Sequence, residues 1–338
     1  MSPDPTRAAR HRVVVYGDAF ADCVPELSRH LGTAYTVSHV PFDTPGRDLE
    51  AALAGAIAVI AVQTNAGPPF EAGLLLLQVP GIGWDGVDPR QVPVTASICT
   101  VGGHETAVAE YCVAQMLEWN RRLFDADRQF RRGSWARSSR FGGRPDRELA
   151  GATVGIIGFG AIGRELARLL SAFNMRVLVA NRSMIVDQAT VAAAYPLDSL
   201  QDMLSACDFA VAAIALTPET RGLIGADLLA ALGPEGVLVN VARGPVVDED
   251  ALWETLTDGR LGGAVLDVWY RYPDSLEAPD QRPAHYDFAS LPNVLMTPHI
   301  SGWTTGTVSR RVAAIAENIR RAAAGQALAG VVAKGTRP

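Results

Sequence analysis

Residues 152–183 read ATVGIIGFGAIGRELARLLSAFNMRVLVANRS, and this stretch gives the strongest structural signal in the 338-residue chain. An apolar, β-branched run ends at Gly158, an amphipathic stretch with helical spacing begins at Gly163, and a second apolar run ends at Ala180. This order predicts a strand, a glycine loop, a helix and a second strand. Continuous apolar strands separated by helices are typical of a parallel sheet that is covered on both faces.

The three glycines of the loop have different physical tasks. Gly158 allows a tight turn, Gly160 lets the backbone approach a pyrophosphate, and Gly163 permits close packing of helix on strand. The first N–H groups of a helix have no intrahelical partners and carry the positive end of its dipole, so they favour an anion. The loop therefore indicates a dinucleotide site. The alternative is a glycine-rich turn that holds no cofactor.

The residues after the second strand bear on which dinucleotide is used. NAD sites place an Asp or Glu there for the ribose 2′-hydroxyl, whereas this chain has Asn181, Arg182 and Ser183. Asn and Ser can donate to a 2′-phosphate, and a guanidinium can pair with it. The sequence thus favours NADP. NAD stays open, because Arg182 can equally be a solvated surface charge.

The rest of the chain continues the alternation of apolar runs and helical stretches, which predicts α/β structure throughout. Two long helices, over residues 105–123 and 304–324, interrupt the rhythm. We expect an N-terminal α/β unit, a linking helix, a dinucleotide-type α/β unit and a C-terminal helix that returns to the first unit. The strands are predicted at residues 13–16, 34–40, 56–62, 74–78, 153–157, 177–180, 209–214, 237–241, 264–267 and 294–297.

Composition and charge argue against several classes of protein. The formal net charge is −6 with no block of like charges, which disfavours a nucleic-acid or anionic-membrane surface. No run approaches the roughly 20 apolar residues of a membrane span, and the first residues lack the apolar region of a secretory signal. Four scattered cysteines indicate reduced, buried thiols. We expect a cytoplasmic protein without a metal site.

Several further motifs, together with the glycine loop, resemble the D-isomer-specific 2-hydroxyacid dehydrogenase family, which includes formate dehydrogenase. The resemblance implies two doubly wound parallel-sheet domains with the active site in the cleft between them. Residues 1–102 and 302–338 would form a flavodoxin-like catalytic domain that binds substrate, residues 103–301 a Rossmann cofactor domain, and the protein a homodimer. The motifs are GIGWDGVD (81–88), VAEY (108–111), LTPETRGLIG (216–225), VNVARGPVVDEDAL (239–252), LDVW (266–269) and TPHISG (297–302).

The resemblance also implies the catalytic residues. Arg243 would bind the substrate, since its planar fork suits a carboxylate and can polarise the carbonyl; a surface ion pair is the alternative. The backbone N–H groups of Ile82 and Gly83 would receive the carboxylate. His299 would be the acid/base, because imidazole titrates near the working pH. An isolated histidine is more often structural, but the TPHISG context reverses that expectation.

The cofactor contacts follow in the same way. Asp267 matches a residue near the nicotinamide, where it would bond the carboxamide or an adjacent backbone group; a plain structural aspartate at the strand end is the alternative. The remaining contacts implied by the matching motifs are Ala161, Ile162, Thr217, Ala242 and Gly302.

Two positions depart from the family pattern. Most members have a Glu five residues after the aspartate of the DV motif, and formate dehydrogenases have Gln; this chain has Tyr272. A tyrosine hydroxyl can orient an imidazole but supplies no negative charge, so we expect His299 to be less biased towards its protonated form. A loop carboxylate, Asp274, Glu277 or Asp280, could instead replace the missing Glu. His104, where formate dehydrogenases have Asn, is either a substrate ligand or a helix-start residue.

These observations predict NAD(P)H-dependent reduction of a 2-keto acid to a D-2-hydroxy acid, or the reverse. Trp84 and Trp303 are expected at the pocket, where they would suit a bulky substrate side chain. Two alternatives remain open. One is a formate- or phosphite-type dehydrogenase, and the other is a nucleotide-sensing interaction protein with little turnover.

Overall fold

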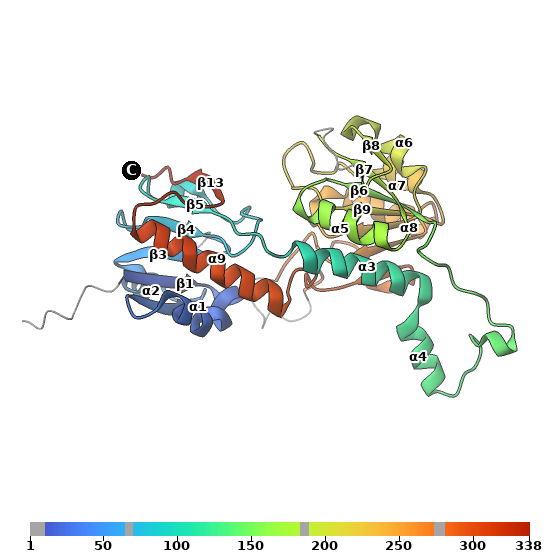
Figure 1. The fold of residues 1–338 in the computed structure, drawn as a ribbon, viewed down its shortest axis with the longest axis horizontal. Coiled ribbons are helices and arrows are strands. Elements are labelled where there is room, and N and C mark those ends of the chain that lie inside the picture. Colours follow the sequence, from blue (N-terminus) through green and yellow to red (C-terminus); the bar gives the residue numbers. More distant parts are fainter. Residues whose placement is uncertain (1–10, 65–69, 183–188, 274–280) are drawn as a thin grey trace, which may run out of the picture. The chain divides into compact units, whose positions relative to one another are not determined.

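The computed structural model describes residues 11–64, 70–182, 189–273 and 281–338, and the chain forms two compact α/β units (Figure 1). Unit 1 comprises Met1–Gly103 and Thr305–Pro338, and unit 2 comprises His104–Thr304. The predicted loop carboxylates 274, 277 and 280, and Ser183, lie outside the described residues.

Unit 1 is built on a six-stranded sheet with the order β13-β5-β4-β3-β1-β2. Its helices are α1 (Val24–Leu31), α2 (Gly46–Leu53) and α9 (Thr305–Ala323), and its strands are β1 (His11–Tyr16), β2 (Tyr35–Val40), β3 (Ala56–Ala61), β4 (Leu76–Gln78), β5 (Ser97–Cys99) and β13 (Val331–Lys334). Short 3-10 helices lie at Asp18–Cys23 and Pro89–Gln91.

Strand β1 shows why helices cover both faces of this sheet. Successive side chains of a strand point to opposite faces. Val14 packs in one buried cluster with Leu49 of α2, and Val15 packs in the other with Leu27 of α1 and Ile315 of α9. The continuous apolar run of β1 is therefore explained by burial on both sides.

Unit 2 has a seven-stranded sheet with the order β12-β11-β10-β9-β6-β7-β8, and every neighbouring pair is parallel. Its strands are β6 (Thr153–Ile157), β7 (Arg176–Ala180), β8 (Ala193–Tyr195), β9 (Phe209–Ala212), β10 (Val237–Asn240), β11 (Gly263–Leu266) and β12 (Val294–Met296). Its helices are α3 (Glu105–Arg121), α4 (Leu123–Arg131), α5 (Ala161–Ala172), α6 (Leu200–Leu204), α7 (Ala226–Leu232) and α8 (Glu249–Thr257), with 3-10 helices at Ser139–Phe141, Leu197–Ser199, Gly244–Val246 and Phe288–Ser290.

The strand order of unit 2 reverses between β6 and β9. The chain runs outwards from β6 through β7 to β8, then returns to β9 and runs outwards on the other side. In a doubly wound sheet, ligands bind outside the carboxyl ends of the strands at such a reversal. The glycine loop follows β6 at this point.

The predicted strands were incomplete. Strands β5, β8 and β13 were not predicted, because none of them lies in a run of at least three apolar side chains larger than alanine, like those that mark the short strands β4 and β12. In addition, β13 pairs antiparallel with β5, so the sheet of unit 1 is not wholly parallel as expected. The helix predicted over 105–123 ends at Arg121, where Arg122 adopts a left-handed conformation (φ 43°) and α4 begins in a new direction.

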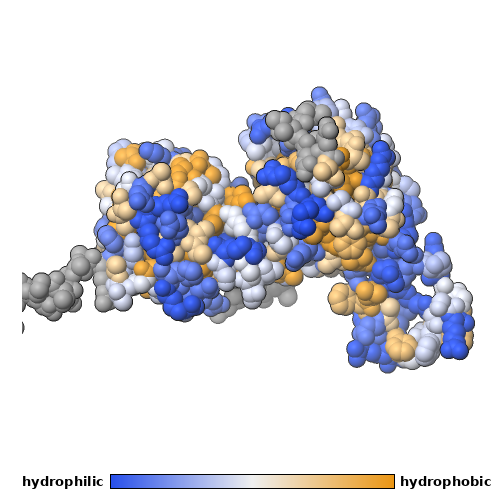
Figure 2. Space-filling view, viewed as in Figure 1, coloured by the Kyte–Doolittle hydropathy of each residue, from blue (hydrophilic) through white to orange (hydrophobic). Residues whose placement is uncertain are grey.

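Residues 122–147 form an arm that leaves the body of unit 2 (Figure 1). Helix α4 has no buried residue, and Figure 2 shows hydrophilic and hydrophobic side chains next to each other on the arm. Arg137 links the two ends of the arm: its guanidinium donates to the carbonyl oxygens of Arg121 and Arg122 and forms an ion pair with Asp146. Among the described residues, no helix is both long and apolar enough to cross a bilayer.

Candidate active site

The glycine loop is tight at two positions and open at the third. Gly158 has φ +99°, and a Cβ there would lie 2.6 Å from the carbonyl oxygen of Ala213. A Cβ at Gly163 would lie 2.3 Å from the carbonyl oxygen of Gly158, so the helix packs against the loop itself. A Cβ at Gly160 would have no atom within 4 Å. The residues present therefore fit a dinucleotide, with free space for a pyrophosphate at the start of α5.

The end of β7 faces the same loop. The Asn181 Oδ1 accepts a hydrogen bond from the Phe159 N–H at 3.4 Å, and Arg182 is exposed. A hydrogen bond from Thr217 is the main cause that lowers the pKa of Glu219, and the positive charge of Arg182 adds to it. Arg182 is therefore within electrostatic range of Glu219, in the turn that contains Thr217.

Ala161 is exposed and Ile162 half-buried in the first turn of α5. Ala242 is buried directly before Arg243. Gly302 lies against His104, since a Cβ at Gly302 would be 3.3 Å from the His104 Cβ. His104 occupies the position before the first residue of α3, so the structure brings it to the turn that contains His299.

The turn that carries Arg243 is fixed by a buried side chain. The Asn240 side chain, 1% exposed at the end of β10, accepts from the Ala242 N–H and donates to the Arg243 carbonyl, both at 3.1 Å. A Cβ at Gly244 would lie 2.3 Å from the carbonyl oxygen of Trp269, so only glycine lets this turn pack on the segment after β11. The guanidinium itself donates to the Ala242 carbonyl at 2.8 Å.

Asp267 follows β11 and is fully buried. Its Oδ1 accepts from the Thr297 hydroxyl at 2.6 Å and from the Ile300 N–H at 2.8 Å, and its Oδ2 accepts from the Ser301 N–H at 2.9 Å. Because the Thr297 proton goes to the carboxylate, the hydroxyl of Tyr111, 2.6 Å away, donates to Thr297. The Asp267 carboxylate thus accepts hydrogen bonds from residues on both sides of His299 and holds this turn in place, as expected of a structural aspartate.

His299 has φ 58°, a left-handed conformation that is unfavourable for a non-glycine residue. The three hydrogen bonds from the surrounding turn to Asp267 offset this cost. The side chain is exposed, and its Nδ1 lies 3.0 Å from the Tyr272 hydroxyl. That hydroxyl also accepts from the Trp269 N–H at 3.1 Å, and the indole N–H of Trp269 donates to the Thr297 carbonyl at 2.9 Å.

The Tyr272 hydroxyl connects the catalytic candidates. Desolvation raises its pKa, while the hydrogen bond from the Trp269 N–H and, to a smaller extent, the positive charge of Arg243 act in the opposite direction. The last residues of β10, β11 and β12 are register partners in adjacent parallel strands. Arg243, Tyr272 and His299 therefore all follow strand ends at the same edge of the sheet as the glycine loop, and Tyr272 and His299 are in hydrogen-bond contact there.

The substrate candidates Ile82 and Gly83 belong to unit 1, where Ile82 is 48% exposed and Trp84 packs at the edge of a buried cluster. Trp303 of unit 2 is 51% exposed, and its backbone N–H donates to the Ile300 carbonyl.

Sequence reasoning missed the residues that hold the catalytic candidates in place. These residues are Tyr111, Asn240, Gly244, Trp269 and Thr297. All of them lie inside the matching motifs, which is the signal that could have identified them.

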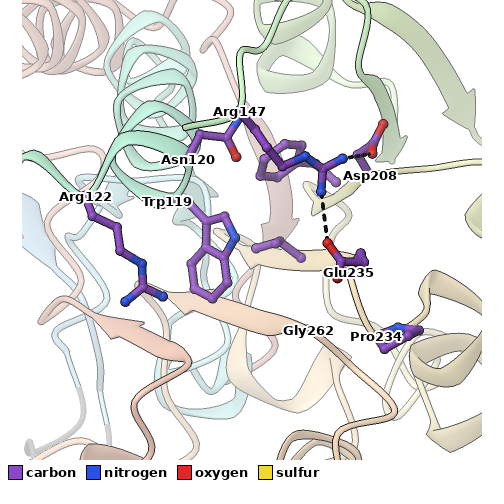
Figure 3. A pocket seen from close by; sticks show the side chains of 10 residues that line it. Trp119, Asn120, Arg122, Arg147, Asp208, Pro234, Glu235 and Gly262 are labelled. Atoms are coloured by element: carbon purple, nitrogen blue, oxygen red, sulfur yellow. Dashed lines mark hydrogen bonds and ion pairs between the residues drawn. The ribbon is translucent and has the colours of Figure 1, made fainter. Parts of the chain in front are cut away.

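A cavity of about 240 Å³ lies at the opposite end of the same sheet (Figure 3). Its lining includes Trp119, Asp208, Glu235 and Gly262, at the amino ends of β9 to β11, and Arg147 pairs there with Asp208 at 2.7 Å. It is therefore separate from the candidate active site. Within the described part of the chain, no group of three His, Cys, Asp or Glu side chains could hold a metal ion.

Comparison with known families identifies the fold. The family model of the D-isomer specific 2-hydroxyacid dehydrogenase, NAD binding domain, matches residues 113–301. The chain belongs to this family. The predicted membership and the α/β fold class with two sheets and a Rossmann-like unit are confirmed, and the protein is an NAD(P)-dependent oxidoreductase of the 2-hydroxyacid type.

Individual relatives agree with this placement. A glyoxylate reductase of Thermococcus gammatolerans is 33% identical over 249 residues, 70% of each chain, and a hydroxyphenylpyruvate reductase of Plectranthus scutellarioides is 37% identical over 201 residues, 59% of each. A crystal structure of an NADPH-dependent glyoxylate/hydroxypyruvate reductase from Sinorhizobium meliloti, in complex with NADP and malonate, superposes with a TM-score of 0.76 at 26% identity, covering 98% of this chain and 100% of that one.

Proposed function

We propose that this protein reduces a 2-keto acid to a D-2-hydroxy acid with NADPH, or catalyses the reverse reaction. One observation carries the proposal. The hydrogen-bonded pair of Tyr272 and His299 lies at the same edge of the sheet as Arg243, at the carboxyl ends of β10 to β12, in the unit whose glycine loop fits a dinucleotide. When bound, the cofactor supplies or accepts the hydride.

The residues of the chain would divide the remaining work. The Arg243 guanidinium binds the substrate carboxylate and polarises the carbonyl. His299 donates a proton to the oxygen that becomes the alcohol, or removes it in the reverse direction. Tyr272 keeps the imidazole in position through Nδ1, which leaves Nε2 for the substrate.

We assign the cofactor role to residues 103–301 and the substrate-binding role to residues 1–102 and 302–338. Within residues 1–102, the backbone N–H groups of Ile82 and Gly83 would donate hydrogen bonds to the substrate carboxylate. Asp267 acts as a positioning residue, because its carboxylate already accepts three hydrogen bonds from the turn that contains His299.

NADP is the proposed cofactor. Arg182 is exposed after β7, next to an asparagine rather than the acidic residue that an NAD site places there. A guanidinium attracts a 2′-phosphate, whereas a carboxylate would repel it. The Sinorhizobium meliloti structure holds NADP, which supports the same choice.

We further propose a homodimer that forms through the arm. The arm exposes three packed aromatic rings, Phe130, Trp135 and Phe141, at 55%, 56% and 70%, with centroid distances of 5.0 and 6.2 Å. The arm, residues 122–147, contains eight arginines and three aspartates, although the whole chain has a net charge of −6. The remainder of a second copy is therefore acidic and would attract this arm. Exposed aromatic clusters of this kind mark interaction surfaces.

A formate- or phosphite-type dehydrogenase is the second candidate. Hydride transfer from formate releases CO2 and requires no proton abstraction. The neutral hydroxyl of Tyr272 as the partner of His299 would suit such a reaction, because the histidine needs no charged support there.

A substrate screen separates these candidates. The protein is assayed with a panel of 2-keto acids and NADPH or NADH, and with formate or phosphite and the oxidised cofactors. Reduction of a keto acid that falls about a hundredfold in Arg243→Ala and in His299→Ala supports the leading proposal. Activity on formate or phosphite alone supports the second candidate. Nucleotide binding without turnover over the whole panel contradicts both and points to a sensing role.

A further inference from the structure

Arg164 has an unusual place in the glycine loop region. It lies in the first turn of α5, is exposed, and donates a hydrogen bond from Nη1 to the carbonyl oxygen of Phe159 at 3.1 Å. Phe159 is the residue between Gly158 and Gly160. The side chain of Arg164 therefore folds back from the helix onto the loop.

The charge of Arg164 is unfavourable for the helix by itself. The N-terminus of a helix carries the positive end of the dipole, so acidic side chains stabilise the first turn and cations destabilise it. The first turn of α5 contains no acidic residue, and Arg164 forms no ion pair with any carboxylate in the described parts of the chain. A bound anion would remove this repulsion.

Arg168, one turn later on α5, provides the contrast. Its guanidinium pairs with Glu165 at 2.8 Å through two hydrogen bonds, so its charge is already balanced. Both arginines are exposed on the same helix. Only Arg164 is directed to the loop.

The geometry leaves Arg164 free to reach an anion at the start of the helix. Side chains on a helix lean towards its N-terminus, and residues three apart lie on the same face. The residue three before Arg164 is Ala161, which is exposed and short, and Gly160 beyond it has open space. A guanidinium has five N–H donors, and the Phe159 carbonyl uses one of them.

We propose that Arg164 is a ligand of the cofactor pyrophosphate, alongside the backbone N–H groups of the loop. This inference rests on the proposed function only in that the loop holds a dinucleotide. Arg164 would bind the part that NAD and NADP share, whereas Arg182 would bind the 2′-phosphate. The two arginines would therefore contribute differently to affinity and to cofactor preference.

Calorimetric titration of the purified protein, without substrate, tests this division. The ligands are NADPH, NADH, ADP-ribose, and 2′-AMP, which has the 2′-phosphate but no pyrophosphate. We expect Arg164→Ala to weaken NADPH, NADH and ADP-ribose by about tenfold or more, as for the loss of a charge-assisted hydrogen bond, and to leave 2′-AMP unchanged. Arg164→Lys should restore part of the affinity, because it keeps the charge but not the fork.

Two matched variants serve as controls. Arg168→Ala should change none of the four affinities, and Arg182→Ala should weaken only NADPH and 2′-AMP. Unchanged dinucleotide binding in Arg164→Ala, or a loss confined to NADPH and 2′-AMP, would overturn the inference while leaving the proposed function intact. A wild-type protein that binds no dinucleotide would overturn both. Thermal unfolding of each variant verifies that the fold is retained.

Discussion

The hydroxyl of Tyr272 lies 3.0 Å from Nδ1 of His299 and accepts a hydrogen bond from the backbone N–H of Trp269 at 3.1 Å. Since one lone pair of the hydroxyl is used by Trp269, its proton is directed to the imidazole when Nδ1 is unprotonated. When the imidazole is protonated, the second lone pair can accept from Nδ1. Desolvation raises the pKa of Tyr272 above its ordinary value, so the hydroxyl keeps its proton in the neutral range.

Tyr272→Glu should therefore change the pH dependence of catalysis. In the proposed mechanism, reduction needs the protonated imidazole of His299, so the rate should be full at low pH and be lost as the pH rises and the imidazole loses its proton. A carboxylate beside Nδ1 stabilises the imidazolium, and we expect the alkaline limb of the kcat/KM profile to move up by about one pH unit. Tyr272→Phe, which removes the hydrogen bond without adding charge, should lower kcat and leave the limb in place. An unmoved limb in Tyr272→Glu would show that another group sets the titration.

Arg243→Lys should lose most of the activity although it keeps the charge. A lysine ammonium cannot form the two parallel hydrogen bonds that a guanidinium forms with a carboxylate. We expect kcat/KM for the keto acid to fall about a hundredfold, with NADPH affinity within a factor of two of the wild type. Arg260→Lys, at an exposed ion pair with Asp258, is the matched control and should have no effect. Comparable activity in both variants would remove Arg243 from the substrate site.

Gly244→Ala tests the contact between the Arg243 turn and the segment that leads to Tyr272. The new Cβ would lie 2.3 Å from the Trp269 carbonyl oxygen, so one of the two segments must move. We expect a loss of about 1–3 kcal/mol in the free energy of unfolding, measured by denaturant titration, and a large drop in kcat. Gly259→Ala is unsuitable as a control because of its positive φ, whereas a Cβ at Gly73 meets no atom within 4 Å and Gly73→Ala should be nearly neutral.

Asp267→Asn should disturb the turn that contains His299. An amide replaces one acceptor oxygen with a donor, which would face a backbone N–H or the Thr297 hydroxyl. An unsatisfied buried donor costs about 1–3 kcal/mol, so the melting temperature should fall by several degrees and kcat should fall with it. If Asp267 instead contacted the cofactor alone, the affinity for NADPH would drop while the melting temperature of the cofactor-free protein stayed constant.

Replacing the aromatic residues of the arm should affect assembly. By light scattering at micromolar concentration, we expect a dimer for the wild type and a monomer for the triple variant Phe130→Ser, Trp135→Ser and Phe141→Ser. Helix α4 has no buried residue, so the fold of the body should survive, as circular dichroism can verify. A wild type that is itself monomeric, or a triple variant that remains dimeric, would contradict an interface through these rings.

The spacing of apolar residues was sufficient to predict the α/β fold class, because this spacing reflects which side chains of each helix and strand are buried. The strand before Gly158 and the helix after Gly163 were predictable from apolar spacing and glycine positions alone. The short strands β5 and β8 were not, because Ser97–Cys99 and Ala193–Tyr195 lack the run of apolar side chains larger than alanine that marks the equally short β12, and their pairing is set by neighbouring strands. The antiparallel edge strand β13 likewise depends on the partner that it meets in space.

The sequence by itself determined the family, the α/β class and the candidate side chains at positions 243, 272 and 299, because these follow from motifs whose order is written along the chain. The tertiary structure alone decided which atoms meet: that the Tyr272 hydroxyl lies between Trp269 and His299, that Asp267 accepts three hydrogen bonds, and that Arg164 folds onto Phe159. The physical reason is that hydrogen bonds act over about 3 Å, and only the packing of distant segments sets separations at that scale.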